Sequence, residues 1–270
     1  EYLDHPVDIE EGTRTLEAPR GDVAFDGVWF RYEDGAWTLQ DVSFDVPAGS
    51  KTALVGETGS GKTTAGYLVA RLYDVTRGAV AIDGIDVREL TFASLAGAVG
   101  VVSQETYLFH ASVRDNLRFA RPDASDEEVE EAARAAGARP FIAGLAGGYL
   151  HPVTERGRSL SAGQRQLIAL ARARLVDPAI LVLDEATSTL DLASEARVTR
   201  AMSAVAEGRT TLLIAHRLQT AQGADRIVVI DDGRVAEEGT HDDLLSRGGR
   251  YAAMWRAFEG GPPALAEQGV

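Results

Sequence analysis

The sequence predicts an α/β protein built on a largely parallel sheet that helices cover. Two observations carry this prediction. Apolar runs of the buried-strand type at Ile180–Leu183, Thr211–Ile214 and Ile227–Ile230 are separated by helical segments, as in a parallel sheet with crossover helices. A glycine-rich turn joins a further short strand, Thr52–Val55, to a helical stretch that reaches Leu72.

The N-terminal part of the chain has a different strand pattern. Val23–Tyr32 and Leu39–Val46 alternate apolar and polar residues, which is typical of half-buried antiparallel strands joined by a turn. Ala79–Ile82 and Val99–Val102 are further short strands. The dipeptide Asp232-Gly233 indicates a hairpin between the last two strands.

Helices are expected in the middle of the chain, and both ends look irregular. Val113–Leu145 is mostly helical in pattern, and the acidic stretch Asp126–Glu131 suits a solvated helix start. Ser161–Val176 is a strong helix candidate. Residues 1–21 are polar and non-periodic, like a linker, and residues 260–270 resemble a flexible tail.

Composition excludes several classes of function. The chain has 270 residues, of which 45% are apolar, enough for a large core. Its net charge of −14 argues against a general nucleic-acid binder, and no nucleic-acid partner is expected. Without cysteine it can form neither disulfides nor thiolate metal sites. The longest apolar run, around Leu95–Val102, is far shorter than a bilayer span, and no secretory signal is visible.

One segment has the residue types of a phosphate-binding loop. It follows a strand, precedes a helix and fits the pattern G-x-x-x-x-G-K-[ST]. Its glycines would let successive backbone N–H groups point at a phosphate, at the positive end of the helix dipole. The residues expected to bind nucleotide are Gly56, Glu57, Thr58, Gly59, Ser60, Gly61, Lys62, Thr63 and Thr64.

Two side chains of this loop have specific expected roles. Lys62 would contact the terminal phosphates and Thr63 would coordinate Mg²⁺. Lys62 is one of only two lysines in the chain, so its presence here is not compositional background. The alternative is an ordinary glycine-rich turn.

Two acidic residues end the apolar strand Ile180–Leu183. An acid at the carboxyl edge of a parallel strand faces the crevice where phosphates bind. Asp184 would hold Mg²⁺ through water, and Glu185 would orient or deprotonate the attacking water. The alternative is a polar strand end that caps the next helix.

A third motif, Leu160-Ser161-Ala162-Gly163-Gln164, opens a helix about 20 residues before Asp184. With the two preceding motifs it resembles the nucleotide-binding domain of ABC transporters, from about Gly21 to Gly260. The resemblance implies a P-loop NTPase (RecA-like) core, an N-terminal antiparallel β subdomain and an α-helical signature subdomain at about residues 105–178. It implies an ATP- and Mg²⁺-dependent ATPase domain at residues 22–259, and a linker from a missing membrane domain at residues 1–21.

Four more family motifs occur along the chain. Tyr32 matches the A-loop, and its ring could stack on adenine; otherwise it is a plain strand aromatic. Gln104 matches the Q-loop and could contact Mg²⁺ or the attacking water, or simply be a strand-end hydrogen bonder. His216 matches the switch histidine and could contact the γ-phosphate or polarise Glu185; a lone histidine there is more often structural. Asp191 ends the D-loop-like Ser188–Asp191 and is also a reasonable helix N-cap.

The resemblance also implies how two domains assemble. In this family the signature lies away from the phosphate loop of its own chain. Two domains therefore pack head to tail, and each closes over the ATP of the other. The residues that would contact nucleotide in trans are Ser161, Ala162, Gly163, Gln164 and Asp191.

Several residues around these motifs are similar to exporter-type members. Thr154–Gly157 resembles the X-loop, and Tyr107–Phe109 with Val113–Asn116 resembles the exporter pattern after the Q-loop. Ala162 departs from the usual glycine of the signature, and we expect activity to survive because Ser161 and Gly163 are intact.

The resulting hypothesis is an exporter ATPase domain whose ATP-driven dimerisation powers transport. Its expected partners are a second such domain and a transmembrane domain fused at the N-terminus, and its expected location is the cytoplasmic face of the plasma membrane. The alternatives are an importer ATPase subunit, a soluble ABC ATPase without a transport role and a regulator that binds nucleotide without hydrolysis. Intact Glu185 and His216 argue against the regulator.

Overall fold

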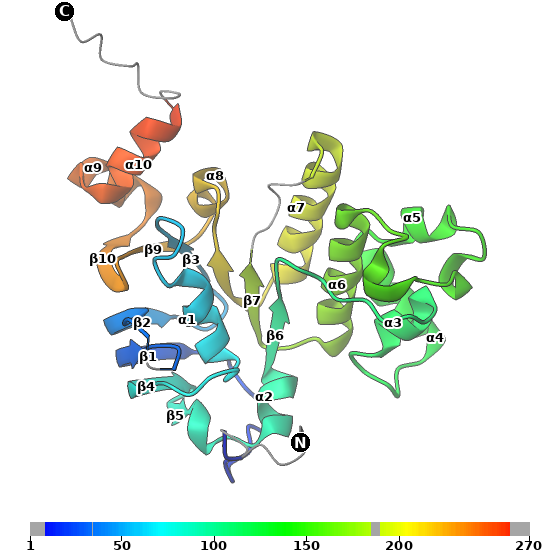
Figure 1. The fold of residues 1–270 in the computed structure, drawn as a ribbon, viewed down its shortest axis with the longest axis horizontal. Helices are drawn as coiled ribbons and strands as arrows, with labels where there is room; N and C mark the ends of the chain where they lie inside the picture. Colours follow the sequence, from blue (N-terminus) through cyan, green and yellow to red (C-terminus); the bar gives the residue numbers. More distant parts are fainter. Residues whose placement is uncertain (1–8, 34, 185–189, 260–270) are drawn as a thin grey trace, which may run out of the picture.

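The computed structural model describes residues 9–33, 35–184 and 190–259, which form two sheets with helices around them (Figure 1). The smaller sheet is antiparallel and has the strand order β2-β1-β4-β5. Its strands are β1 (Val23–Phe30), β2 (Leu39–Val46), β4 (Arg77–Ile82) and β5 (Ile85–Asp86).

The larger sheet confirms the predicted parallel core. Its order is β10-β9-β3-β8-β7-β6, parallel throughout except for β10, which is antiparallel to β9. The strands are β3 (Lys51–Val55), β6 (Val99–Val102), β7 (Ile180–Asp184), β8 (Thr210–Ile214), β9 (Arg226–Asp231) and β10 (Arg234–Gly239). The predicted hairpin at Asp232-Gly233 joins β9 to β10, and both residues have the positive φ that such a tight turn requires.

Helices lie on both sides of the larger sheet (Figure 1). The helices are α1 (Lys62–Val69), α2 (Phe92–Ala98), α3 (Val113–Arg118), α4 (Asp126–Ala135), α5 (Arg139–Ala143), α6 (Ala162–Val176), α7 (Leu192–Ala206), α8 (Leu218–Gln222), α9 (His241–Arg247) and α10 (Arg250–Glu259). The predicted helical stretch Val113–Leu145 is therefore three short helices, because a turn around Pro122 and the left-handed Gly137 interrupt it. Among the described elements, no helix is long and apolar enough to cross a bilayer.

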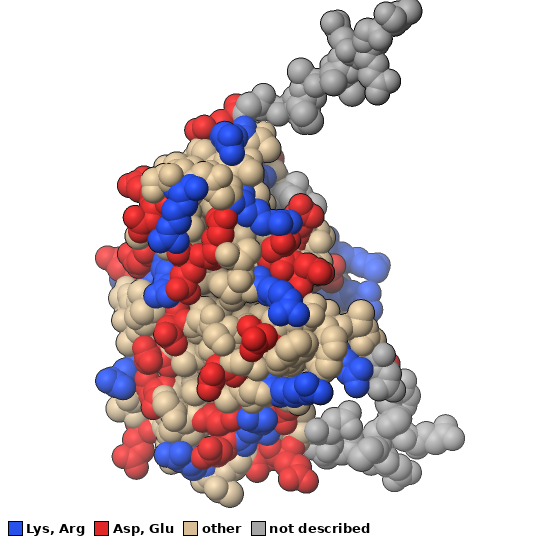
Figure 2. All heavy atoms as spheres, turned by 90° about the vertical axis from the view of Figure 1, so that its left-hand side faces the viewer, with Lys and Arg blue, Asp and Glu red and all other residues tan. Residues whose placement is uncertain are grey.

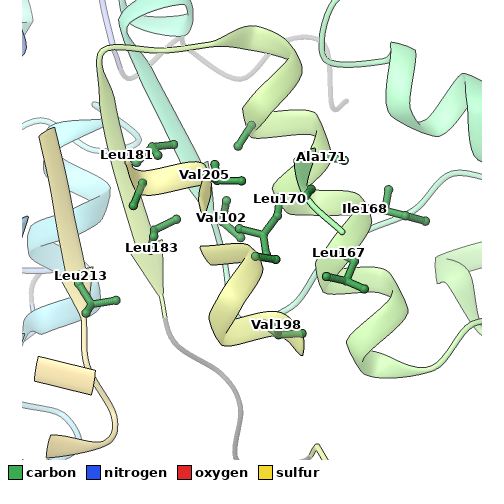
Figure 3. Close-up of a cluster of buried hydrophobic side chains, with 14 of the residues drawn as sticks. Val102, Leu167, Ile168, Leu170, Ala171, Leu181, Leu183, Val198, Val205 and Leu213 are labelled. Carbon is green, nitrogen blue, oxygen red and sulfur yellow. The ribbon is translucent and has the colours of Figure 1, made fainter. Parts of the chain in front are cut away.

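The central strands β3, β7, β8 and β9 of the larger sheet are buried on both faces, which explains why they are apolar runs. On β7, Leu181 and Leu183 belong to one hydrophobic cluster and Ile180 and Val182 to another. Figure 3 shows the first cluster, in which Leu170 of α6 lies beside these leucines. The second cluster fills the space between the two sheets and α1.

The described part of the predicted linker, residues 9–21, packs on the domain rather than extending from it. The Gly12 amide donates to the Leu90 carbonyl at 3.2 Å, and the Arg14 amide donates to the Glu89 carbonyl at 2.8 Å. A Cβ atom at Gly12 would lie 2.1 Å from the carbonyl carbon of Glu89, so only glycine permits this approach.

The surface of the smaller sheet and of the neighbouring β10 edge faces the viewer in Figure 2. Acidic and basic side chains are interspersed over this face, without a large area of one sign. The negative net charge is therefore not focused into one field on this side of the molecule.

Candidate nucleotide-binding site

The phosphate-binding motif forms a tight loop between β3 and α1. Gly56 has a φ of 150°, and a Cβ atom there would lie 2.0 Å from the Ile230 carbonyl oxygen. Gly61 is the N-cap of α1 with a φ of 104°, and its Cβ would lie 2.5 Å from Leu39 Cδ2. Glycine is required at both positions, and the loop therefore presents bare backbone at the start of a helix, where anions bind.

Lys62 lies inside this loop and is only 5% exposed. Its Nζ donates to the carbonyl oxygens of Gly56 at 2.9 Å and Glu57 at 2.8 Å, and contacts Ser60 Oγ at 3.4 Å. Burial lowers the pKa of Lys62, while the negative charge of Asp184 acts in the opposite direction. The loop thus surrounds a buried ammonium group, the charge that a terminal phosphate requires.

Asp184 brings α1, β7 and the end of β8 together. Its Oδ2 accepts a hydrogen bond from Thr63 Oγ1 at 3.2 Å, and its Oδ1 lies 3.1 Å from His216 Nε2. Gly66 allows this assembly, because a Cβ there would lie 2.7 Å from Val182 Cγ1 and α1 could not pack so close to the sheet. A hydroxyl, a carboxylate and an imidazole from distant parts of the sequence therefore meet beside the phosphate loop.

Tyr32 adds an aromatic ring on the other side of α1. Its hydroxyl lies 2.9 Å from Thr64 Oγ1, and its side chain is 40% exposed. The ring follows β1, so the antiparallel sheet places it beside the helix that carries Lys62 and Thr63. An exposed ring at this place is available for stacking on a nucleobase.

The signature residues open α6, as predicted. Ser161 is the N-cap; its Oγ accepts from the Gln164 amide at 3.2 Å, and Gln164 Oε1 accepts from the Ser161 amide at 2.8 Å. Gly163 lies against α7, since its Cβ would be 3.2 Å from Ser194 Cβ. The first turn of α6 is thereby held by its own capping hydrogen bonds and by its contact with α7.

Asp191 is the N-cap of α7, in agreement with the helix-capping interpretation. Its Oδ1 accepts from the Ala193 amide at 3.1 Å and from the Ser194 amide at 3.0 Å. Hydrogen bonding to Ser194, followed by the backbone contributions, lowers the pKa of Asp191. The cap does not exclude a contact with nucleotide across a dimer interface, because Asp191 is exposed.

Other predicted site residues are not assembled with the phosphate loop. Within the described ranges, no hydrogen bond connects Ser161–Gln164 or Asp191 to residues 56–64. Gln104 is exposed and lines a cavity of about 660 Å³ with Ala162 and Arg165, and Asp184 is not among the residues of that lining. Glu185 and the first D-loop residues, Ser188 and Thr189, lie outside the described residues.

Sequence reasoning missed two residues that organise the surroundings of the site. Tyr73 contacts Tyr32, with ring centroids 5.1 Å apart. Arg172 of α6 donates to the backbone oxygens of Asn116 at 2.7 Å and Tyr107 at 2.9 Å, and burial lowers its pKa to about 10. Neither residue lies in a recognisable motif, although both partners of Arg172 lie in the exporter-like segments Tyr107–Phe109 and Val113–Asn116.

Comparisons with known proteins agree with this geometry. Residues 39–188 match the family described as "ABC transporter". An uncharacterized ABC transporter ATP-binding protein of Bacillus subtilis, YknV, is 48% identical over 259 residues, covering 95% of this chain and 43% of that protein. A multidrug efflux ATP-binding/permease protein of Mycobacterium bovis is 50% identical over 254 residues, covering 91% of this chain and 21% of that protein. The chain thus spans less than half the length of these relatives.

A solved structure shows the same fold. The structure of a bacterial Atm1-family ABC exporter with ATP bound matches with a TM-score of 0.89 and 42% identity, covering 97% of this chain and 46% of that chain. This likeness confirms the predicted P-loop NTPase architecture, with its parallel core, antiparallel sheet and helical part. Because the family match covers more than half of its residues, the chain belongs to the ABC transporter family.

Proposed function

We propose that this chain is the ATPase domain of an ABC exporter and hydrolyses Mg-ATP. The observation that carries the proposal is the glycine loop closed around the buried Lys62 ammonium, with the Asp184–Thr63 pair at its side. In this proposal the loop amides and Lys62 hold the β- and γ-phosphates, and Tyr32 stacks on the adenine.

The donor set beside the loop fits Mg²⁺. Thr63 Oγ1 and Asp184 Oδ2 are hard oxygen atoms 3.2 Å apart, and Mg²⁺ in nucleotide sites takes one or two such protein ligands and keeps several waters. When bound, Mg²⁺ supplies positive charge to the phosphate oxygens. Gln104 is proposed as a further ligand, because it follows β6, which pairs with the strand that ends in Asp184.

The remaining side chains would manage the attacking water and its proton. His216 is held by Asp184 at 3.1 Å, which orients its imidazole at the carboxyl edge of the sheet. Glu185, the next residue after Asp184, is proposed as the general base on the basis of its place in the sequence. Lys62 and His216 would then stabilise the charge that develops on the transferred phosphoryl group.

A second copy of the domain is proposed to complete the site. The first turn of α6 presents backbone N–H groups and Ser161, yet in the described structure nothing links it to the phosphate loop of its own chain. Head-to-tail packing would put Ser161–Gln164 of one copy over the ATP of the other. ATP would then favour association, and loss of phosphate would release it.

A transmembrane domain is the proposed partner on the helical side. An apolar groove of about 390 Å³ lies between β6 and α6. Its wall includes Val101, Tyr107, Phe109 and Phe119, each at least 36% exposed. Large apolar side chains gathered at a groove mark an interaction site. The names of the efflux and exporter relatives support a partner in the membrane, and we propose that the domain lies on the cytoplasmic face of that membrane.

ATPase measurements with Glu185→Gln test the proposal. We expect ATP binding to persist, turnover to fall about 10²–10⁴-fold and an ATP-bound dimer to accumulate in size-exclusion chromatography. The control is Glu207→Gln, an exposed acid that follows α7. An unchanged rate in Glu185→Gln would remove Glu185 from the mechanism, and absence of ATP hydrolysis by the unsubstituted chain at any concentration would refute the proposal.

A further inference from the structure

Three aromatic rings form a mutual cluster beside the phosphate-loop helix. Tyr32 meets Phe30 edge to face, with centroids 4.8 Å apart and an interplanar angle of 89°. Tyr32 also meets Tyr73 at 5.1 Å and 90°. Phe30 and Tyr73 close the triangle at 5.7 Å. Such edge-to-face pairs are directional, because the positive edge of one ring is attracted to the negative face of another.

Tyr73 is not a core residue. It is 42% exposed, whereas Phe30 beneath it is 3% exposed. Its main aromatic neighbours are Tyr32 and Phe30, with Tyr67 of α1 further away at 6.5 Å. A side chain so exposed contributes little by burial, so its position is better explained by what it does to Tyr32.

The turn that carries Tyr73 is fixed by a buried arginine. Arg71 adopts a left-handed conformation with a φ of 52° directly after α1, and it is 5% exposed. Its Nε donates to Asp74 Oδ1 at 2.8 Å, and its Nη2 donates to the Glu10 carbonyl at 2.6 Å. The backbone on both sides of Tyr73 is therefore anchored, which holds the base of its side chain beside Tyr32.

Tyr32 is held from a third side by its hydroxyl, which lies 2.9 Å from Thr64 Oγ1. The Tyr32 carbonyl accepts a hydrogen bond from the Gly35 amide at 3.0 Å, Thr64 contacts the tip of the ring, and Phe30 and Tyr73 restrict its rotation. A ring that is oriented before the ligand arrives loses less conformational freedom on binding.

From this geometry we infer that Tyr73 is a positioning residue, which orients the Tyr32 ring for stacking on the nucleobase. The inference rests on the proposed function of Tyr32. It predicts that Tyr73 affects the affinity for the base of the nucleotide and not the affinity for its phosphates, which are bound by a different part of the site.

The test compares two ligands by isothermal titration: Mg-ATP, and Mg-tripolyphosphate, which has no base. For Tyr73→Leu we expect the Kd of ATP to rise about 3- to 10-fold, the size of an edge-to-face pair. The Kd of tripolyphosphate should stay unchanged, and Tyr73→Phe should restore the affinity for ATP. The matched control is Leu72→Ala, at the neighbouring exposed position.

Tyr32→Ala separates this inference from the proposed function. If Tyr32 stacks on the base, Tyr32→Ala should lower the affinity for ATP about 10- to 100-fold and leave the affinity for tripolyphosphate unchanged. If Tyr32→Ala has this effect and Tyr73→Leu has none, the positioning role is overturned while the proposed function stands. If Tyr73→Leu weakens the binding of ATP and of tripolyphosphate equally, the positioning role is also overturned, because a general disturbance of the site would then be the cause. If Tyr32→Ala leaves ATP binding intact, the stacking role and the inference both fail.

Discussion

Thr63 Oγ1 donates a hydrogen bond to Asp184 Oδ2 at 3.2 Å, across 121 residues of sequence. The contact joins the start of the phosphate-loop helix to the end of a central strand. It is possible because Gly66, one turn further along α1, lets the helix lie directly on Val182 and Ile214. The two oxygen atoms therefore meet where a metal-bound phosphate would lie.

Asp184→Asn should make ATP binding insensitive to magnesium. We expect the affinity for Mg-ATP to fall about 10- to 100-fold, the effect of losing one charge-assisted interaction. Removal of the metal with EDTA should weaken ATP binding to the unsubstituted chain but not to the variant. The measurement is the Kd of ATP with and without Mg²⁺, and Asp45→Asn, at an exposed position of β2, is the control. A variant that still responds to Mg²⁺ in full would contradict the role of Asp184.

Lys62→Ala should abolish stabilisation by nucleotide. A ligand at 100 times its Kd stabilises the folded state by about 2.7 kcal/mol, and this increment should disappear with the ammonium group. The chain supplies its own control, because Lys51 at the start of β3 is the only other lysine. Thermal unfolding with and without Mg-ATP measures the difference. A normal upward shift in Lys62→Ala, or a lost shift in Lys51→Ala, would contradict the assignment.

Ser161→Ala should lower ATPase activity further than the loss of a helix cap alone explains. Ser161 and Ser125 occupy the same position in a capping box, at α6 and α4 respectively. Loss of either cap should cost about 1 kcal/mol of unfolding free energy. Only Ser161 is proposed to contact ATP, so only Ser161→Ala should reduce turnover beyond this common effect. Equal rates in the two variants would reduce Ser161 to a capping residue.

A mixture of Lys62→Ala and Ser161→Ala chains tests whether the site is shared between two copies. In a mixed dimer, one site combines an intact Lys62 with an intact Ser161 from the other chain. The mixture should therefore be more active than either variant alone, and the gain should depend on protein concentration because it requires association. If the activity of the mixture equals the mean of the two variants measured separately, each chain uses the signature residues of its own chain.

The sequence predicted best where one local pattern determines the structure. The strand Leu39–Val46 has the predicted bounds. Its apolar and polar residues alternate, and in the structure the apolar residues lie on the buried face and the polar residues on the other face. The phosphate loop was also predictable, since one short segment contains all its special glycines. The predicted helix to Leu72 is too long, because α1 ends at Val69. Arg71 turns into the left-handed region to contact Leu90 and Glu10, and no local pattern reveals those partners.

Long-range contacts explain what sequence reasoning missed in the site. The sequence predicts that Tyr32 could stack on adenine, but it does not reveal the contacts of its side chain with Thr64 and Tyr73, which lie elsewhere in the chain. Likewise, the sequence does not predict that residues 9–21 pack on the domain, because their few apolar side chains show no periodicity. They pack through backbone groups, with Gly12 against Glu89, and backbone pairing leaves little trace in composition.

Tyr251→Phe should have opposite effects on stability at neutral and at high pH. Tyr251 is fully buried in α10, its hydroxyl lies 2.8 Å from His241 Nδ1, and burial raises its pKa to about 12. At pH 8 the variant loses this hydrogen bond, and we expect a cost of about 1 kcal/mol. Between pH 10 and pH 12 the unfolded chain releases the phenolic proton while the folded chain keeps it, so the unsubstituted protein loses stability as pH rises.

Phenylalanine has no proton to release, so this part of the pH dependence should vanish in the variant. The loss amounts to about 1.4 kcal/mol per pH unit at most, which would bring the two proteins to equal stability near pH 11. Arg172 acts in the opposite direction in this range, because its pKa is lowered to about 10, but it is common to both proteins and cancels in the difference. Denaturant unfolding at pH 8, 10 and 11 measures that difference. A constant gap across this series would mean that the buried phenol titrates as it does in water.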